Sequence, residues 1–389
     1  MDQFERLAAR CVVAGIAGPV ATPEELALVR RGVGGIILFS RNVQDPEQVA
    51  RLSQSLKAAA PGPLTISIDQ EGGRVQRLRP PHWTQLPPLR RLGEIDTHGG
   101  VAGMTGPQVA EKLGALIAKE LSACGIDQDY APVVDVDTNP QNPVIADRSI
   151  SRDPAQVARL GIALGQALEK GGVASCAKHF PGHGDTSQDS HTTLPRLAHD
   201  LKRLWECELV PFMAAARAQL ASVMTAHVVF EALGGETATL SEAALRLLRE
   251  EIGFTGVCYS DDLEMGAIAQ HVGALEAAPL ALEAGCDAVL VCSSLRLQHL
   301  VIDGIARAAR AGPLARGRLQ EAAARIGELQ KRFVKAASAI EPSKAAAACG
   351  TAEAREFAAL LSAVPAVTQT QTHAHTHPQH DPTERGLST

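Results

Sequence analysis

Eight short apolar runs alternate along this chain with segments of helical periodicity, and this pattern limits the possible folds more than any other feature. The runs are near-continuous in apolar residues, as in parallel strands that helices cover. They occupy residues 11–16, 34–39, 64–69, 131–136, 173–178, 222–227, 256–261 and 287–292. Segments between them, such as 105–125 and 154–172, place apolar residues at i, i+3 and i+4 and end in glycine. The sequence therefore predicts an α/β fold, a single (β/α)8 barrel of the TIM type, regular or irregular, with a doubly wound open sheet as the alternative.

The character of the chain changes after the last of these segments. Residues 1–338 are expected to form the barrel, and the small-residue stretch 339–367 predicts one extra helix. Residues 368–389 are polar and repetitive, which predicts a disordered His/Thr-rich tail. The histidines of this tail could bind a divalent metal weakly, but we expect them to have no part in catalysis. They are His373, His375, His377 and His380.

Composition excludes several classes of partner. The chain is 45% hydrophobic and has a net charge of -6, so it has enough apolar residues for a core and no basic surplus for nucleic acid or anionic membranes. No apolar run approaches the roughly 18 residues that span a bilayer. The N-terminus, MDQFERLAARCVVAGIAG, lacks the features of a signal peptide. We therefore expect a monomeric, cytoplasmic protein with a small ligand.

The cysteines give no sign of a disulfide framework. Eight of them are scattered without CxxC spacing, several inside apolar runs. We expect buried free thiols.

A barrel makes a specific demand on the position of functional residues, which should lie at or just after the carboxyl ends of strands. Polar side chains occupy such positions at Asp69, Lys178-His179, His227 and Asp261. The fourth run leads into a long loop, 135–154, rich in proline, asparagine and aspartate. Long loops on this face usually build pockets.

The segment KHFPGHGDTSQDSH, residues 178–191, has the highest density of polar groups and allows three interpretations. His179 and His183 are four apart, as in zinc-binding helices, but the intervening Pro181 and the glycines disfavour a helix. The glycines, Lys178 and the following hydroxyls resemble a phosphate loop, but their order does not match one. We therefore predict no metal and no cofactor.

The third interpretation of this segment is an acid/base loop. Asp189 and His191 are two residues apart, so the carboxylate can orient the imidazole and raise its basicity. Histidine can donate and recover a proton near neutral pH. The alternative is that both side chains only satisfy backbone groups of the loop. We also expect residues 181–184 to form a mobile elbow behind this pair.

The same segment resembles the signature loop of the β-N-acetylglucosaminidases of glycoside hydrolase family 3, of the bacterial cell-wall recycling type. Further segments resemble the family in order along the chain, and together they cover roughly residues 10–335. They are IDQEGGRVQRLR (68–79), APVVDVD (131–137), NPVIADRSISRDP (142–154), VMTAHVVF (223–230) and YSDDLEMGAI (259–268).

The resemblance implies a retaining hydrolase that removes terminal β-linked N-acetylglucosamine through a covalent glycosyl-enzyme. It implies Asp261 as the nucleophile, His191 as the general acid/base and Asp189 as its orienting partner. A nucleophile on a strand end is rigid, and an acid/base on a loop can approach first the leaving group and then water. The adjacent Asp262 raises a substrate-assisted mechanism as a rival. Because successive strand residues point to opposite faces, we expect only Asp261 to reach the pocket and Asp262 to cap or brace the next helix.

The resemblance also implies substrate-binding residues. They are Asp69, Arg77, Arg148, Lys178 and His179. Carboxylates and charged donors suit the hydroxyls of a pyranose. Structural roles are the alternatives for two of them: Arg148 would pair with Asp137 or Asp147, and Lys178 would neutralise Asp189 or Asp261. His183 and His227 are expected to shape the loop and the pocket floor.

Three functions remain open from the sequence. The first is hydrolysis of N-acetylglucosamine from anhydromuropeptide fragments in peptidoglycan recycling. The second is a glycoside phosphorylase, since a histidine acid repels phosphate less than a carboxylate does. The third is an inactive sugar-binding barrel, which we disfavour because every key position is filled.

Overall fold

The computed structural model describes residues 1–190, 193–312 and 314–366. Eight parallel strands form a barrel whose neighbours follow one another along the chain, from β1 to β2, β3, β6, β7, β9, β11 and β12. The last strand pairs with the first, because Val12 to Ala14 of β1 face Val289 to Val291 of β12. The predicted (β/α)8 barrel is thereby confirmed, and a doubly wound open sheet is excluded. The strands are β1 Val12–Gly15, β2 Gly35–Leu38, β3 Thr65–Ile68, β6 Gln128–Asp129, β7 Cys176–Phe180, β9 Ser222–Thr225, β11 Val257–Asp262 and β12 Ala288–Val291.

The barrel is least regular between β6 and β7. Here two isolated parallel bridges take the place of a ladder: Gln128 of β6 pairs with Ala174, just before β7, and Val133, after β6, pairs with Lys178 of β7. The prediction of a strand over 131–136 is wrong, because β6 lies three residues earlier, at Gln128–Asp129. Residues 131–136 run beside β7 without a continuous ladder, since Pro132 has no N–H to donate. The segment still bonds to β7, for example from Val134 N to the Lys178 carbonyl oxygen at 2.8 Å.

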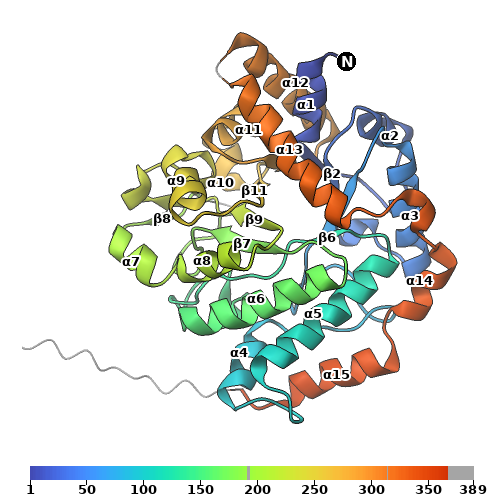
Figure 1. Cartoon of the computed structure of the whole chain (residues 1–389), viewed down its shortest axis with the longest axis vertical. Coiled ribbons are helices and arrows are strands. Elements are labelled where there is room, and N and C mark those ends of the chain that lie inside the picture. Colours follow the sequence, from blue (N-terminus) through green and yellow to red (C-terminus); the bar gives the residue numbers. More distant parts are fainter. Residues whose placement is uncertain (191–192, 313, 367–389) are drawn as a thin grey trace, which may run out of the picture.

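Helices surround the barrel, as the periodicity of the intervening segments predicted (Figure 1). The predicted helices at 105–125 and 154–172 are α5 and α6, which end at Ala123 and Lys170, shortly before Gly125 and Gly172. The φ values of these glycines, +73° and +83°, are in the left-handed region that is common just after the end of a helix. The α-helices are α1 Gln3–Arg10, α2 Pro23–Arg30, α3 Pro46–Ala59, α4 Arg90–Thr97, α5 Gly106–Ala123, α6 Pro154–Lys170, α7 Leu201–Glu206, α8 Val210–Arg217, α9 Glu242–Arg246, α10 Gly266–Ala269, α11 Ala274–Ala284, α12 Leu295–Ala311, α13 Arg316–Phe333, α14 Pro342–Ala348 and α15 Ala352–Ala363.

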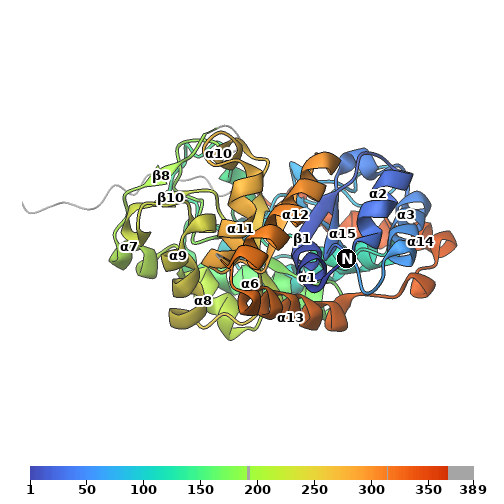
Figure 2. The same cartoon turned by 90° about the horizontal axis from the view of Figure 1, so that it is seen from above.

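Shorter elements decorate the barrel. The hairpin β4–β5 follows β3, and the parallel pair β8–β10 lies beside α10 in Figure 2. These elements are β4 Gln70–Gly72, β5 Val75–Gln76, β8 Arg196–Leu197, β10 Val229–Phe230, the 3₁₀ helices η1 Ser40–Asn42, η2 Ala146–Arg148, η3 Glu231–Leu233, η4 Ala238–Leu240 and η6 Ala337–Ala339, and the π-helix η5 Leu247–Glu251.

The range 339–367, where the sequence predicts one extra helix, contains two, α14 and α15. Helix α14 lies against α3 and α5, and α15 lies against α4 (Figure 1). The tail 368–389 and its four histidines lie outside the described residues.

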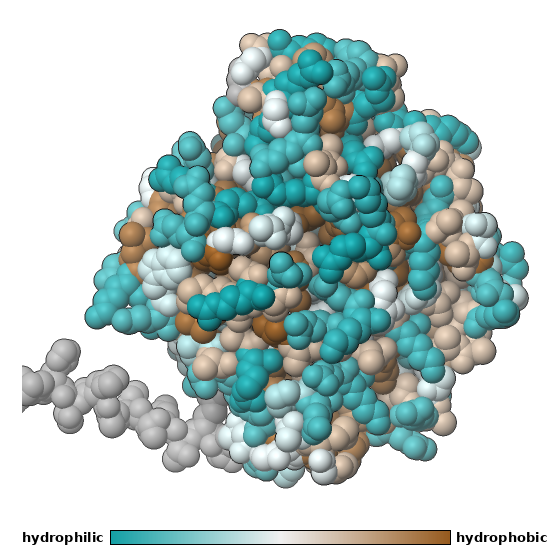
Figure 3. Space-filling model, in the orientation of Figure 1, coloured by the Kyte–Doolittle hydropathy of each residue, from teal (hydrophilic) through white to brown (hydrophobic). Residues whose placement is uncertain are grey.

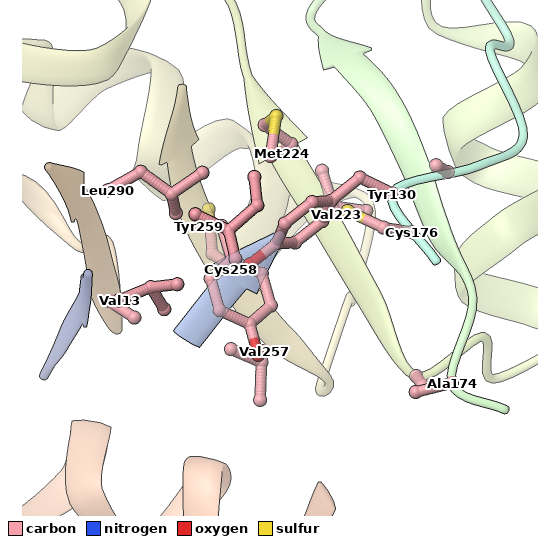
Figure 4. Packing of buried hydrophobic residues seen from close by; sticks show 14 of the residues in the cluster. Val13, Tyr130, Ala174, Cys176, Val223, Met224, Val257, Cys258, Tyr259 and Leu290 are labelled. Atoms are coloured by element: carbon pink, nitrogen blue, oxygen red, sulfur yellow. The ribbon is translucent and has the colours of Figure 1, made fainter. Parts of the chain in front are cut away.

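The interior of the barrel is filled with side chains (Figure 4). The rings of Tyr130 and Tyr259 meet edge to face at 5.5 Å. Tyr259 donates a hydrogen bond to Gln128, whose amide reaches the hydroxyl of Ser222. This polar chain satisfies groups that burial would otherwise leave unpaired.

The outer surface over α13 and α6 is largely hydrophilic, as the composition of the chain led us to expect. In Figure 3, hydrophilic side chains cover much of the face that α13 and α6 form, and small hydrophobic areas lie between them. All eight cysteines are buried free thiols, as predicted. Within the described part of the chain, no helix is both long and apolar enough to cross a membrane.

Candidate active site

The hairpin after β3 supplies one wall of the candidate site. Asp69 follows β3 directly, and its carboxylate is 3.0 Å from the guanidinium of Arg77, just after β5. Gly72 makes the tight turn of this hairpin possible, because its φ is +99° and a Cβ there would lie 2.3 Å from the carbonyl oxygen of Pro87. The hairpin thus folds Arg77 back onto the strand end that carries Asp69.

Side chains of alternating charge form a row across the site. The ammonium of Lys178 in β7 is 2.8 Å from Asp69 and 2.7 Å from Glu71. Arg148 of η2 donates two hydrogen bonds of 2.8 Å to the carboxylate of Glu71. Although burial alone would raise it, Arg148 and Lys178 lower the pKa of Glu71 to about 2, and Lys178 and Arg77 hold the pKa of Asp69 well below its usual range. Both carboxylates are therefore charged at neutral pH.

The observed ion-pair partners of Arg148 and Lys178 differ from those expected from the sequence. Arg148 contacts Glu71, whereas Asp137 pairs with Arg90 at 2.6 Å and Asp147 pairs with Arg74 at 3.3 Å. Those alternatives for Arg148 are wrong because η2 turns its guanidinium inward, toward the β4–β5 hairpin. The carboxylates in contact with Lys178 are Asp69 and Glu71, neither of which was the expected partner.

Two bulges aim consecutive side chains into the same cavity. In β7, Lys178 pairs with Met224 and Phe180 with Thr225, so His179 is an extra residue. In β11, Tyr259 pairs with Ala288 and Asp262 with Leu290, so three residues of β11 oppose two of β12. The expectation that Asp262 points away from the pocket is wrong, because this bulge breaks the alternation of side chains, and both Asp261 and Asp262 line the cavity.

The two adjacent carboxyls differ in their electrostatics. Burial alone would raise the pKa of Asp261, but the nearby His179 and His227 rings bring it below its usual value. Burial, reinforced by Glu264 and Asp261, raises the pKa of Asp262 to about 7. Asp261 is therefore ionised at neutral pH, while Asp262 is poised between its two forms.

Asp262 braces the chain, although it does not cap the next helix. Its Oδ1 accepts from the backbone N–H of Glu264 at 3.1 Å and of Cys292 at 3.3 Å. Helix α10 begins after Met265, which holds the N-cap position. The predicted bracing is present at the turn after β11 and across to β12.

These side chains converge on a cavity of about 330 Å³ at the carboxyl ends of the strands. This volume is at the lower end of the usual range for small-ligand pockets. All five predicted sugar-binding residues and Asp261 line it. The lining is Ile37, Phe39, Asp69, Glu71, Val75, Arg77, Val144, Arg148, Lys178, His179, His183, Ser190, Met224, Asp261, Asp262, Met265, Leu290 and Cys292.

A larger cavity of about 710 Å³ lies at the other end of the barrel, beside α6 and α13. Chemistry in TIM-type barrels belongs to the carboxyl end of the strands. We therefore assign the candidate site to the smaller, charged cavity.

The loop after β7 is firmly packed where it starts. Pro181, Gly182, His183 and Gly184 are buried. Asn142 donates to the carbonyl oxygens of His183 and Gly184, and a Cβ on Gly184 would lie 1.7 Å from the carbonyl oxygen of Val136. The elbow expected at 181–184 is thus a buried, hydrogen-bonded turn.

His183 connects the two ends of the following loop. Its Nδ1 is 2.8 Å from the hydroxyl of Thr186 and its Nε2 is 2.9 Å from that of Ser190. Burial lowers the pKa of His183 to about 4, so the ring is neutral at pH 7. Asp189 is half-buried in this loop, and its predicted partner His191 lies outside the described residues. His227 is not among the residues that line the cavity, and its Nε2 is 3.0 Å from the carbonyl oxygen of Asp262.

Sequence reasoning missed two buried carboxylates of the site. Glu71 is 2% exposed and holds Lys178 and Arg148, and Asp135 is 1% exposed and holds His179. Both occur within the segments that resemble the family, Glu71 in IDQEGGRVQRLR two residues after Asp69, and Asp135 in APVVDVD. Their place in these segments was the available signal.

No group of three or more histidine, cysteine or acidic side chains with the geometry of a metal site occurs among the described residues. The paired histidines of the zinc interpretation, His179 and His183, have ring centroids 5.8 Å apart. Hydrogen bonds occupy one nitrogen of His179 and both nitrogens of His183.

The chain is similar to known proteins over most of its length. Residues 15–329 match the glycosyl hydrolase family 3 N-terminal domain. A β-hexosaminidase of Neisseria meningitidis serogroup C is 46% identical over 285 residues, which are 72% of this chain and 78% of the relative. One from Thiobacillus denitrificans is 42% identical over 272 residues, or 69% and 74% of the two chains.

Solved structures agree with this likeness. NagZ from Neisseria gonorrhoeae, in complex with N-trifluoroacetyl-D-glucosamine, superposes with a TM-score of 0.77 at 37% identity, covering 91% of this chain and 97% of that one. A family 3 β-N-acetylglucosaminidase from Paenibacillus superposes with a TM-score of 0.85 at 36% identity, covering 93% and 68%. Sequence, barrel and charged cavity together establish that this chain is a glycoside hydrolase and belongs to glycoside hydrolase family 3.

Proposed function

We propose that the protein is a retaining exo-acting β-N-acetylhexosaminidase that hydrolyses terminal β-linked N-acetylglucosamine. The observation that carries the proposal is the convergence of Asp261 with Asp69, Lys178, His179 and Arg148 on one cavity. The names of the relatives, β-hexosaminidase and β-N-acetylglucosaminidase, support the same substrate class.

The row of charged side chains across the site suits recognition of one pyranose. Lys178 and the two arginines are donors, and Asp69 is an acceptor for adjacent hydroxyls. Because Glu71 fixes Lys178 and Arg148 from behind, these donors are held in place before the sugar arrives. We assign Asp69, Arg77, Arg148, Lys178 and His179 to binding of the terminal sugar.

Asp261 suits the role of nucleophile. Its lowered pKa keeps it ionised, and the end of β11 holds it at the floor of the cavity. In the proposed reaction, Asp261 attacks the anomeric carbon while His191 protonates the leaving oxygen. His191 then removes a proton from the water that hydrolyses the glycosyl ester, and Asp189 orients it throughout.

The presence of Asp262 in the cavity keeps the substrate-assisted rival open to experiment. In that route the acetamido oxygen attacks, and an acidic pair assists it. N-trifluoroacetyl substrates distinguish the routes, because fluorination weakens the acetamido oxygen as a nucleophile. We expect a modest change in kcat/KM, whereas a steep loss would contradict a direct attack by Asp261.

Trapping of the glycosyl-enzyme is the decisive test. We expect a fluorosugar substrate to leave a covalent adduct on the peptide that contains Asp261, detected by mass spectrometry, and no adduct in Asp261→Ala. An adduct on another residue would overturn the assignment.

We further propose that the substrates are N-acetylglucosamine-anhydromuropeptide fragments of peptidoglycan recycling in the cytoplasm, and that the enzyme acts as a monomer. Product analysis tests the reaction class. Release of free N-acetylglucosamine in phosphate-free buffer supports hydrolysis, while formation of the sugar 1-phosphate only when phosphate is present would identify a phosphorylase.

A further inference from the structure

Asp135, which no part of the proposed mechanism uses, holds the end of β7 through both of its oxygens. Its Oδ1 accepts from the backbone N–H groups of His179 at 3.1 Å and His183 at 2.7 Å. Its Oδ2 is 2.7 Å from Nδ1 of the His179 ring. One carboxylate therefore anchors the backbone and, separately, the imidazole.

The charge of Asp135 decides where the proton of that imidazole lies. Burial alone would raise the pKa of Asp135, but His179 and the hydrogen bonds it donates lower it. An ionised carboxylate only accepts hydrogen bonds, so Nδ1 of His179 carries a proton. The other nitrogen, Nε2, is then left for the cavity that the ring lines.

We infer that Asp135 is a positioning residue that fixes the ring orientation and the tautomer of His179, so that Nε2 meets the bound sugar. The inference rests on the proposed function in one respect, namely that His179 contacts the substrate. The competing explanation is that Asp135 only anchors the backbone at the end of β7.

Because Oδ1 of Asp135 bonds to the backbone and Oδ2 to the imidazole, one substitution can separate a role in orienting His179 from a role as a backbone anchor. In Asp135→Asn, the amide oxygen can still accept from both backbone N–H groups. The amide nitrogen replaces Oδ2 and donates toward Nδ1, which moves the ring proton to Nε2. The backbone anchor is kept while the tautomer of His179 is reversed.

Ring ¹⁵N spectra give a readout that does not depend on activity. In protein labelled at its histidines, with the His179 signals assigned from His179→Ala, we expect the Nδ1–H form in the wild type. In Asp135→Asn we expect the Nε2–H form. The same tautomer in both proteins would overturn the inference.

Activity provides the second readout. We expect Asp135→Asn to lower kcat/KM on a β-N-acetylglucosaminide by roughly 10- to 100-fold, the range found for carboxylates that orient metal-binding histidines. In a His179→Ala background the same substitution should cause no further loss. A loss that persists in that background would show that Asp135 affects activity by a route other than His179, and it would overturn the inference.

Asp127 offers a matched control. Like Asp135, it is buried and accepts a backbone N–H, that of Ile66 at 2.9 Å, and it pairs with Lys57, but it lies at the opposite end of the barrel strands. Asp127→Asn should lower stability and leave kcat/KM unchanged below its melting temperature. A wild type without turnover would contradict the proposed function, while the ¹⁵N spectra would still test the inference.

Discussion

Individual ionisable residues at the carboxyl end of the barrel are shifted in opposite directions. Cations lower the pKa values of Asp69 and Glu71, whereas burial, with the neighbouring Asp69 and Glu71, raises the pKa of Asp129 to about 8. Asp129 accepts the backbone N–H of Gln70 with one oxygen and has no partner for the other. The site thus keeps Asp69 and Glu71 charged and keeps Asp129 protonated at neutral pH.

This shift makes a prediction about stability and pH. Between the unfolded pKa of 3.8 and the folded value of about 8, the native state binds a proton at Asp129 that the unfolded state does not. The free energy of unfolding of the wild type therefore falls as the pH rises through this range. Asp129→Asn removes this loss and retains the acceptor for Gln70. The free energy of unfolding of the variant, relative to the wild type, should therefore increase from pH 5 to pH 8, by at most about 1.4 kcal/mol per pH unit.

Urea unfolding at three pH values measures this difference. The exposed Glu328→Gln on α13 is the control and should run parallel to the wild type. Parallel curves for Asp129→Asn as well would show that Asp129 is ionised in the folded protein.

The proposed role of His191 gives a second prediction at the scale of a residue. Good leaving groups need little protonation, so His191→Ala should lose less activity on nitrophenyl-type substrates than on substrates with poor leaving groups. Asp261→Ala should lose activity equally on both. A steady-state comparison of kcat/KM values measures this, and equal losses for His191→Ala would exclude the acid role.

At the scale of elements, bulges and close backbone contacts decide which side chains meet. The bulges in β7 and β11 turn Lys178 with His179, and Asp261 with Asp262, toward one cavity. The loop after β7 then runs so close to residue 136 that only a glycine fits at position 184. These contacts place the start of the loop for which we propose the acid/base role.

Gly184→Ala should therefore displace this loop. A Cβ at this position would meet backbone atoms of Val136 at 1.7 and 2.5 Å, which cannot rotate away. We expect a loss of stability on the order of 1–3 kcal/mol and a lower kcat/KM, since His183 and Ser190 line the cavity. Thermal unfolding and steady-state kinetics measure the two effects.

Gly62→Ala is the control, because a Cβ there meets nothing within 4 Å. It should leave both quantities near the wild-type values. A Gly184→Ala variant that behaves in the same way would contradict the close contact between the loop and residue 136.

At the scale of the whole molecule, the two C-terminal helices close the side of the barrel formed by α3, α4 and α5. Glu120 of α5 joins the hydroxyl of Thr84 to the backbone N–H of Gly350, at 2.7 and 2.8 Å. Ile340, Phe357 and Leu361 are buried at this junction. These helices follow residue 329, where the match to the family domain ends.

Removal of these helices should destabilise the molecule. Each buried apolar side chain is worth about 1.5–3 kcal/mol, so a chain that ends at Ala336 should melt roughly 5 °C or more below the full chain. A chain that ends at Ala366 keeps both helices, and we expect it to match the full chain in melting temperature and activity. Equal melting temperatures for all three chains would show that the helices contribute nothing.

The sequence by itself determined the barrel and the ionisable residues at its strand ends. Alternating apolar runs and helical segments require parallel strands under helices, and this follows from local periodicity alone. Asp69, Lys178 and Asp261 could be identified because each directly ends or follows such a run. The resemblance to the family supplied Arg77 and Arg148, which lie outside the barrel strands and long helices, where periodicity gives no signal.

The tertiary structure alone decided the partners and directions of these side chains. The pairing of Arg148 with Glu71 joins residues 77 positions apart, and the clamp of Asp135 on His179 joins residues 44 apart. Sequence spacing cannot predict such contacts, because they depend on which strands are neighbours in the closed barrel. Asp262 shows the same limit, since alternation along a strand predicts its direction only until a bulge, set by pairing with β12, adds a residue.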